Sequence, residues 1–223
     1  MLSEWTAECS NDAPTLIVPW SDEASGAHFL DLRANPYDIA EIPEAEHNPT
    51  LARSLRSLNA TRSPFLTAKC DTWTLSAAGQ GEQTATLETL RLELMLSEED
   101  ATHGYASYID LLWRERSVFA SAHQQQDRLD RIVRRAQRLH HPEAALSCVL
   151  RPALLDLSGP FEGFSVTLYV TAVAPEPDAA RRRWELAMED IVALLRDKLL
   201  ELTRGSATID ATDAYPLRVR HIG

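Results

Sequence analysis

The segment 177–205 constrains the fold more than any other, because its apolar residues recur at steps of three and four. This spacing places side chains on one face of an α-helix. Pro177 and Asp178 mark a helix start, and Gly205 marks a stop. A helix of this length spans roughly 40 Å, so its apolar side needs a broad surface, which we expect to be a β-sheet. The residues of that side are Trp184, Met188, Ile191, Leu195, Leu199 and Leu202.

Several other segments have the alternation or the residue types that favour β-strands. The clearest is 86–96, in which leucine occupies every second position from Leu90 to Leu96, and we expect it to form a hairpin with 105–114. A second pair of segments, 146–157 and 164–173, predicts another hairpin around a short turn. The remaining predicted strands are 15–20 paired with 27–33, 64–76, and an edge strand at 217–221.

Two more helices are predicted from apolar residues at helical spacing, a short one at 48–59 and a long one at 117–139. Hairpins favour an antiparallel sheet, and one-sided alternation places the helices on a single face. The predicted fold class is therefore α+β, with a mainly antiparallel sheet carrying two long helices and one short helix on one face. A hairpin followed by a helix occurs at 86–139 and again at 146–203, which indicates an internal duplication.

The charge of the chain is concentrated near its N-terminus. The net charge is -11, and residues 1–50 contain ten acidic residues and one basic residue, Arg33. We expect 1–14 to be a loose acidic lead-in and 15–223 to form a single α+β domain, for which 44% apolar residues supply a sizeable core. An acidic surface repels phosphate backbones, so nucleic acid is not an expected partner.

Nothing in the sequence resembles a targeting or membrane segment. The N-terminus has acids where a signal peptide has basic residues, and no apolar run approaches the ~20 residues that span a bilayer. Cys9, Cys70 and Cys148 are odd in number and far apart, which is typical of reduced thiols. These features predict a soluble, cytoplasmic protein with no membrane partner.

The motifs that carry known chemistry are missing from the sequence. It has no nucleophile elbow, no phosphate-binding P-loop, no H-E-x-x-H helix and no EF-hand loop, so no cofactor is expected. A reactive Cys70 or Cys148 is disfavoured, because strand neighbours bury thiols and raise their pKa. A metal site at His140, His141 and Glu143 is also disfavoured, since adjacent helical histidines point about 100° apart. No metal ligands are therefore assigned.

The candidate ligand-binding residues are Lys69, Asp71 and Trp73, which alternate along one face of the predicted strand 64–76. A lysine and a carboxylate two residues apart, beside an aromatic ring, could form a small-ligand site, because burial tunes the pKa of lysine. The alternative is a cross-strand ion pair on the open face of the sheet, and that alternative is favoured unless the face is concave and covered.

Seven arginines form a second candidate set, for an anion or an acidic partner. One group lines a face of the predicted helix 117–139, and three more lie near the start of the last helix, where the helix dipole opposes positive charge. The compensating negative charge could come from a ligand, from a partner or from the acidic first 50 residues, and the last source is favoured. The set comprises Arg128, Arg131, Arg135, Arg138, Arg181, Arg182 and Arg183.

Because no catalytic constellation is visible, the leading hypothesis is a non-catalytic α+β module that binds a small ligand or a protein partner, as a homodimer. The alternative is an enzyme of the hydrolase or transferase class whose site gathers dispersed residues around Lys69, Asp71 and Trp73. Sequence spacing does not separate the two hypotheses, since active sites are assembled in space.

Overall fold

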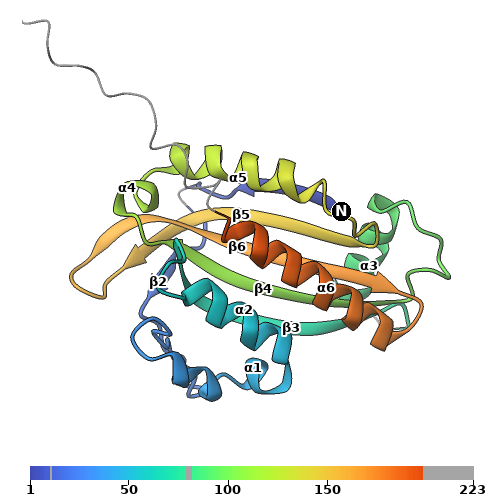
Figure 1. The fold of residues 1–223 in the computed structure, drawn as a ribbon, viewed down its shortest axis with the longest axis horizontal. Helices are drawn as coiled ribbons and strands as arrows, with labels where there is room; N and C mark the ends of the chain where they lie inside the picture. The colour runs from blue at the N-terminus through green and yellow to red at the C-terminus, as the bar shows by residue number, and fades with distance from the viewer. Residues whose placement is uncertain (11, 79–81, 198–223) are drawn as a thin grey trace, which may run out of the picture.

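A computed structural model describes residues 1–10, 12–78 and 82–197 of the chain. These residues form a mixed sheet with helices packed on it, so the α+β class is confirmed (Figure 1). The strands are β1 (Leu2–Ala7), β2 (Leu16–Val18), β3 (Phe65–Ser76), β4 (His103–Trp113), β5 (Ala144–Leu155) and β6 (Phe161–Ala174). The helices are η1 (Pro36–Glu41), α1 (Pro43–His47), α2 (Pro49–Asn59), α3 (Glu82–Glu93), α4 (Arg116–Phe119), α5 (Ala122–Ala136) and α6 (Pro177–Leu195).

The sheet has the strand order β1-β5-β6-β4-β3, and β2 also pairs with β5. The central strands β5, β6, β4 and β3 are antiparallel, as the alternating segments predict. The hairpin of β5 and β6 is confirmed, and it is the longest pairing in the sheet. At the outer edge of β5, by contrast, β1 and β2 both run parallel to it.

Helices α2, α5 and α6 lie on one face of the sheet, which we call the helix face (Figure 1). Trp184, Met188 and Ile191 of α6 are fully buried there, which confirms the orientation predicted from their spacing. The indole N–H of Trp184 donates to the hydroxyl of Ser107 on β4, at 3.0 Å. Helix α6 ends at Leu195, and the segment 198–205, which we expected to continue it, lies outside the described residues.

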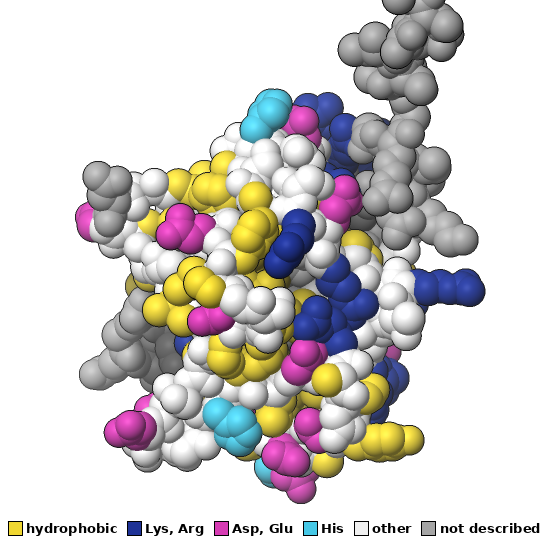
Figure 2. Space-filling view, turned by 90° about the vertical axis from the view of Figure 1, so that its left-hand side faces the viewer, with side chains coloured by type: hydrophobic (Ala, Val, Ile, Leu, Met, Phe, Trp, Pro, Cys, Tyr) yellow, Lys and Arg dark blue, Asp and Glu magenta, His cyan; other side chains and the backbone are white. Residues whose placement is uncertain are grey.

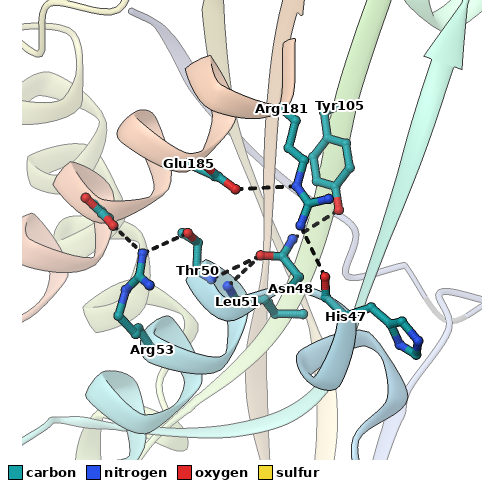
Figure 3. A network of polar contacts seen from close by, with 9 residues as sticks. His47, Asn48, Thr50, Leu51, Arg53, Tyr105, Arg181 and Glu185 are labelled. Carbon is teal, nitrogen blue, oxygen red and sulfur yellow. Dashed lines mark hydrogen bonds and ion pairs between the residues drawn. The ribbon is translucent and has the colours of Figure 1, made fainter. Parts of the chain in front are cut away.

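A polar network fixes the start of α2 against α6 and β4 (Figure 3). The buried Asn48 caps α2, because its side-chain oxygen accepts from two backbone N–H groups of the first turn. The amide nitrogen of Asn48 donates to the hydroxyl of Tyr105, at 3.0 Å. Above the Tyr105 ring lies the guanidinium of Arg181, which also donates to the carbonyl of His47. The Asn48 amide thus joins α2 to β4, and Arg181 adds α6 to the network.

The prediction of a strand at 86–96 is wrong, because most of this segment belongs to helix α3. Leu87 and Leu90 are buried against β3, β4 and β6, whereas Leu92 is 62% exposed. Helix α3 packs on the face opposite the helix face, which we call the second face, so the helices are not confined to one side. The first predicted hairpin–helix unit, 86–139, accordingly has a helix where its first strand was expected.

The N-terminal region also differs from the prediction. Residues 2–7, expected in a loose lead-in, form β1, which adds to β5 in parallel. The prediction of a hairpin between 15–20 and 27–33 is wrong, because β2 pairs with β5 instead. Between the two described segments the structure has only an isolated bridge, from Ser21 to His28. A strand this short carries little local signal, so its pairing depends on the sheet edge that receives it.

The expected helix 117–139 is present but broken into α4 and α5 at Ala120 and Ser121. The Ser121 hydroxyl accepts from the backbone N–H of Gln124 and so starts α5 afresh. The predicted helix at 48–59 and the predicted strand at 64–76 correspond to α2 and β3. The predicted edge strand at 217–221 lies outside the described residues.

Candidate ligand-binding site

A β-bulge interrupts β3 beside a cavity of the described structure. Thr67 pairs with Leu111 and Cys70 with Ile109, so that Ala68 and Lys69 together lie opposite the single residue Asp110. An extra residue of this kind bends the strand and redirects its side chains. The bulge therefore turns Lys69 away from a regular position in the pleat, at the free edge of the sheet.

A cavity of about 480 Å³ lies against this bulge. It is bounded by the strand edge, by the connection after β2 and by the start of α1, and its walls are mostly apolar. The principal lining residues are Trp20, Leu30, Ile42, Leu55, Ala68 and Lys69, with Glu41 and Glu44 at the α1 side. The volume falls within the ~300–1,000 Å³ of typical small-molecule pockets.

Lys69 lies over the ring of Trp20, with its ammonium 4.7 Å from the ring centroid. The Trp20 ring is held in place because its indole N–H donates to the carbonyl of Ala68, at 2.9 Å. Among the described residues, no hydrogen bond or ion pair is made by the Lys69 ammonium; its charge acts at longer range on Asp22 and Asp110. A half-buried cation is thus presented to the cavity on an aromatic platform.

The acidic side of the cavity comes from Glu44, which is half-buried at the start of α1. Its charge reaches the neighbouring thiol: burial first, and then the carboxylate of Glu44, raise the pKa of Cys70 to about 12. At neutral pH Cys70 is therefore a thiol and not a nucleophilic thiolate. The cavity consequently combines one cation with carboxylates and contributes no reactive sulfur.

Behind Lys69, a chain of polar contacts crosses the second face of the sheet. The Thr167 hydroxyl donates to the carboxylate of Asp110, at 2.6 Å, and Arg151 donates to both Thr167 and Glu8. Burial raises the pKa of Asp110, although the hydrogen bond from Thr167 and the charges of Lys69 and Arg151 oppose this effect. Asp110 is 8% exposed, so its carboxyl is a buried acid next to the bulge.

The three residues predicted from the sequence do not line one cavity. Lys69 lines the cavity, whereas Asp71 and Trp73 lie on the second face outside it. The carboxylate of Asp71 accepts from the backbone N–H of Thr72, at 2.6 Å. The Trp73 ring packs against Tyr108 of β4, with centroids 6.3 Å apart. Of the predicted set, only Lys69 is therefore placed for contact with a ligand in this cavity.

Three of the four arginines predicted on the helix 117–139 have interaction partners in the structure. Arg128 lies over the ring of Trp113 and within 3.5 Å of Glu115, and Arg135 pairs with Asp197. Arg131 also has a partner, and Arg138 is exposed. The acids that the structure pairs with Arg128 and Arg135 lie outside the first 50 residues, which were the favoured source of compensating charge.

The arginines at the start of α6 likewise have separate partners. Arg181 lies within 3.4 Å of Glu185, and Arg183 lies at the same distance from Glu143 and also donates to the carbonyl of Val173. Arg182 is exposed. Two of the three cations thus fasten α6 to its surroundings.

The cysteines and histidines discussed from the sequence are dispersed. Burial raises the pKa of Cys148 to about 12. A ring nitrogen of His141 lies 2.8 Å from the carboxylate of Asp190, and His103 contacts the carbonyl of Pro175. Within the described ranges, His, Cys, Asp and Glu form no group of three or more that could hold a metal ion.

Sequence reasoning missed Trp20, Glu44 and Asp110. Trp20 and Glu44 reach the bulge from segments that carry no periodic pattern, and Asp110 looked like one acidic residue in a largely apolar strand. The only available signal was that polar residue, because a buried strand seldom contains an unpaired carboxylate.

Comparisons of the chain with protein-family models, with curated proteins and with solved structures find no match. In the part of the chain that the structure describes, none of the helices is both long and apolar enough to cross a bilayer.

Proposed function

We propose that this protein binds a small zwitterion with an apolar body, of the amino-acid class, in the cavity beside Lys69. The observation that carries the proposal is the Lys69 ammonium, which lies at a cavity of about 480 Å³ with no ion-paired or hydrogen-bonded partner among the described residues. A half-buried cation without such a partner gains from an anionic ligand group that supplies the missing contact.

The lining favours a ligand that carries both signs of charge. Lys69 is the one lysine or arginine among the lining residues, which also include His28, and Glu41 and Glu44 are carboxylates on the α1 side. A ligand with only a carboxylate would be attracted by Lys69 and repelled by the two glutamates. A zwitterion places its carboxylate at Lys69 and its ammonium toward Glu44, while its apolar part packs on Trp20 and the leucines.

Isothermal titration calorimetry with matched ligands tests this proposal. L-Leucine and L-phenylalanine are compared with isocaproate, which lacks the ammonium of leucine, and with isoamylamine, which lacks its carboxylate. We expect at least one of the amino acids to bind with a Kd below about 1 mM, and each leucine analogue to bind roughly tenfold more weakly than leucine. Absence of binding by both amino acids would contradict the proposal.

The variant Lys69→Met tests the role of the cation, because it removes the charge and keeps most of the stem. We expect a loss of affinity of about tenfold or more, and recovery of most of it in Lys69→Arg. Asp71→Asn is the matched control, since Asp71 lies on the same strand but outside the cavity. Equal binding by Lys69→Met and the natural protein, or an equal loss in Asp71→Asn, would argue against Lys69 as the anchor.

The second candidate is an enzyme of the hydrolase or transferase class that uses Asp110, which lies on the second face and does not line the cavity. It is favoured by Asp110, a buried acid with a raised pKa opposite Lys69, because such groups serve as general acids and bases. Chemical conversion of a bound ligand that Asp110→Asn abolishes, with binding retained, would favour this candidate. A homodimer, a protein partner and a cytoplasmic location remain predictions from the sequence.

A further inference from the structure

We propose that a second cavity, at the end of the molecule where α4 meets the β5–β6 turn, binds a small organic phosphate. The cavity has a volume of about 190 Å³ and shares no lining residue with the Lys69 cavity. A volume below the ~300 Å³ of pockets for whole ligands suits one anionic group and part of its substituent. The residues used below are Arg33, Arg114, Arg116, Phe119, Leu157 and Phe161.

Three arginines line this cavity, and none of its lining residues is acidic. They come from different parts of the chain: Arg33 precedes η1, and Arg114 and Arg116 flank the start of α4. Figure 2 views this end of the molecule and shows basic side chains gathered near its middle, beside hydrophobic surface. A concentration of positive charge on a protein with net charge -11 is unexpected.

Arg114 forms the fixed base of the site. Its guanidinium donates to the carbonyls of Asn59 and Ala60 at the end of α2, at 2.6 and 3.0 Å, while its buried Nε has no hydrogen-bond partner among the described residues. Burial lowers the pKa of Arg114, the nearby charge of Arg33 lowers it further, and the carboxylate of Asp31 opposes both effects. Two cations are therefore held close together, with the carboxylate of Asp31 on the Arg33 side.

The other two arginines have side chains that are partly or fully exposed to solvent. Arg33 is paired with Asp31, at 2.7 Å, and about a third of its side chain is exposed. The exposed Arg116 lies over the ring of Phe161, at 4.9 Å, and has no carboxylate partner among the described residues. Stacking leaves the N–H groups at the edge of the guanidinium plane free to donate.

The charge and the walls together select the ligand. An anion among three guanidinium groups relieves their repulsion, and a phosphate monoester, with a charge of about -1.5 to -2, offsets more of it than a carboxylate does. The apolar wall is formed by Phe119 and Phe161, which stack at 5.6 Å, and by the partly exposed Leu157. An aryl or alkyl substituent on the phosphate packs against this wall.

The test uses phenyl phosphate, inorganic phosphate and phenol, each titrated into the full-length protein by calorimetry at low salt. We expect phenyl phosphate to bind most tightly, inorganic phosphate roughly tenfold more weakly and phenol not detectably. Affinity for phenyl phosphate should fall as salt is raised, because the contact is electrostatic. Equal binding of phenol and phenyl phosphate, or no binding of phenyl phosphate, would overturn the proposal.

Two variants test separately the contribution of the positive charge and that of the apolar wall to binding. Arg116→Gln should weaken both phosphates by about tenfold, whereas Leu157→Ser should weaken phenyl phosphate and leave inorganic phosphate unchanged. Arg53→Gln is the control, since Arg53 is an exposed arginine that pairs with Glu189 on α6. All three sites are partly or fully exposed, and thermal melts establish that each variant folds. Undiminished binding by Arg116→Gln, or an equal loss in Arg53→Gln, would refute the site.

Discussion

The carboxyl group of Asp110 lies in the second face of the sheet and accepts a hydrogen bond from the hydroxyl of Thr167. Burial disfavours its charged form and raises its pKa above the ~3.9 of an unfolded aspartate. Between the two pKa values the folded state binds more protons than the unfolded state. The free energy of unfolding therefore falls as the pH rises through this window.

Asp110→Asn should raise the free energy of unfolding at pH ~7, because the amide carries no charge and its oxygen still accepts from Thr167. The gain should shrink as the pH falls below ~3, where the natural carboxyl is mostly protonated in both states. Urea titrations of both proteins at several pH values measure this difference in the free energy of unfolding.

Asp127→Asn controls for the loss of a carboxylate, because Asp127 lies on the exposed side of α5. If Asp110→Asn proves less stable than the natural protein at neutral pH, then the ionised carboxylate is favoured by its surroundings, contrary to the inferred cost of burial.

Among the elements, α3 departs most from what the sequence suggests. Leucines at every second position indicate a strand, yet Leu87, Leu90 and Leu94 also recur at helical spacing. In the structure these three pack against the sheet, whereas Leu92 is largely exposed. The segment is rich in Leu, Glu and Thr, so both patterns fit it and only the neighbouring strands decide between them.

A pair of substitutions distinguishes helix from strand. Leu90→Asp should lower the free energy of unfolding by about 3 kcal/mol or more, because it buries a charge against the sheet. Leu92→Asp should change it by less than about 1 kcal/mol, since Leu92 faces solvent. In a strand both residues would share one face, so similar losses in chemical denaturation would be inconsistent with α3.

At the scale of the whole molecule, the N-terminal strand completes the sheet by pairing with a strand about 140 residues later. Trp5 lies opposite Cys148 of β5, and its indole N–H donates to the carboxylate of Asp130 on α5, at 2.7 Å. The same strand brings Glu8 to Arg151. The N-terminus is thus tied to both the sheet and a helix of the helix face.

Trp5→Ala should lower the free energy of unfolding by about 2 kcal/mol, because it removes apolar contact and the hydrogen bond to α5. Thr6→Ala is the matched change on the exposed side of the same strand and should cost much less. Denaturant midpoints measure both. An effect of Trp5→Ala no larger than that of Thr6→Ala would show that β1 is not part of the cooperative fold.

The sequence alone predicted α6, α2, β3 and the hairpin of β5 and β6, because each carries a local periodic pattern long enough to bury one face. It also identified Lys69 as a residue to test. These features depend on the order of neighbouring residues along the chain and on little else.

The tertiary structure decided the rest. The parallel pairing of β1, the choice of helix for α3 and the bulge that turns Lys69 toward Trp20 all depend on contacts between distant segments. Asp71 and Trp73 share the alternation of Lys69 in the sequence, yet the bulge places them outside its cavity. A local pattern specifies which face a residue prefers, whereas the partner it meets there is set by how the remaining chain packs.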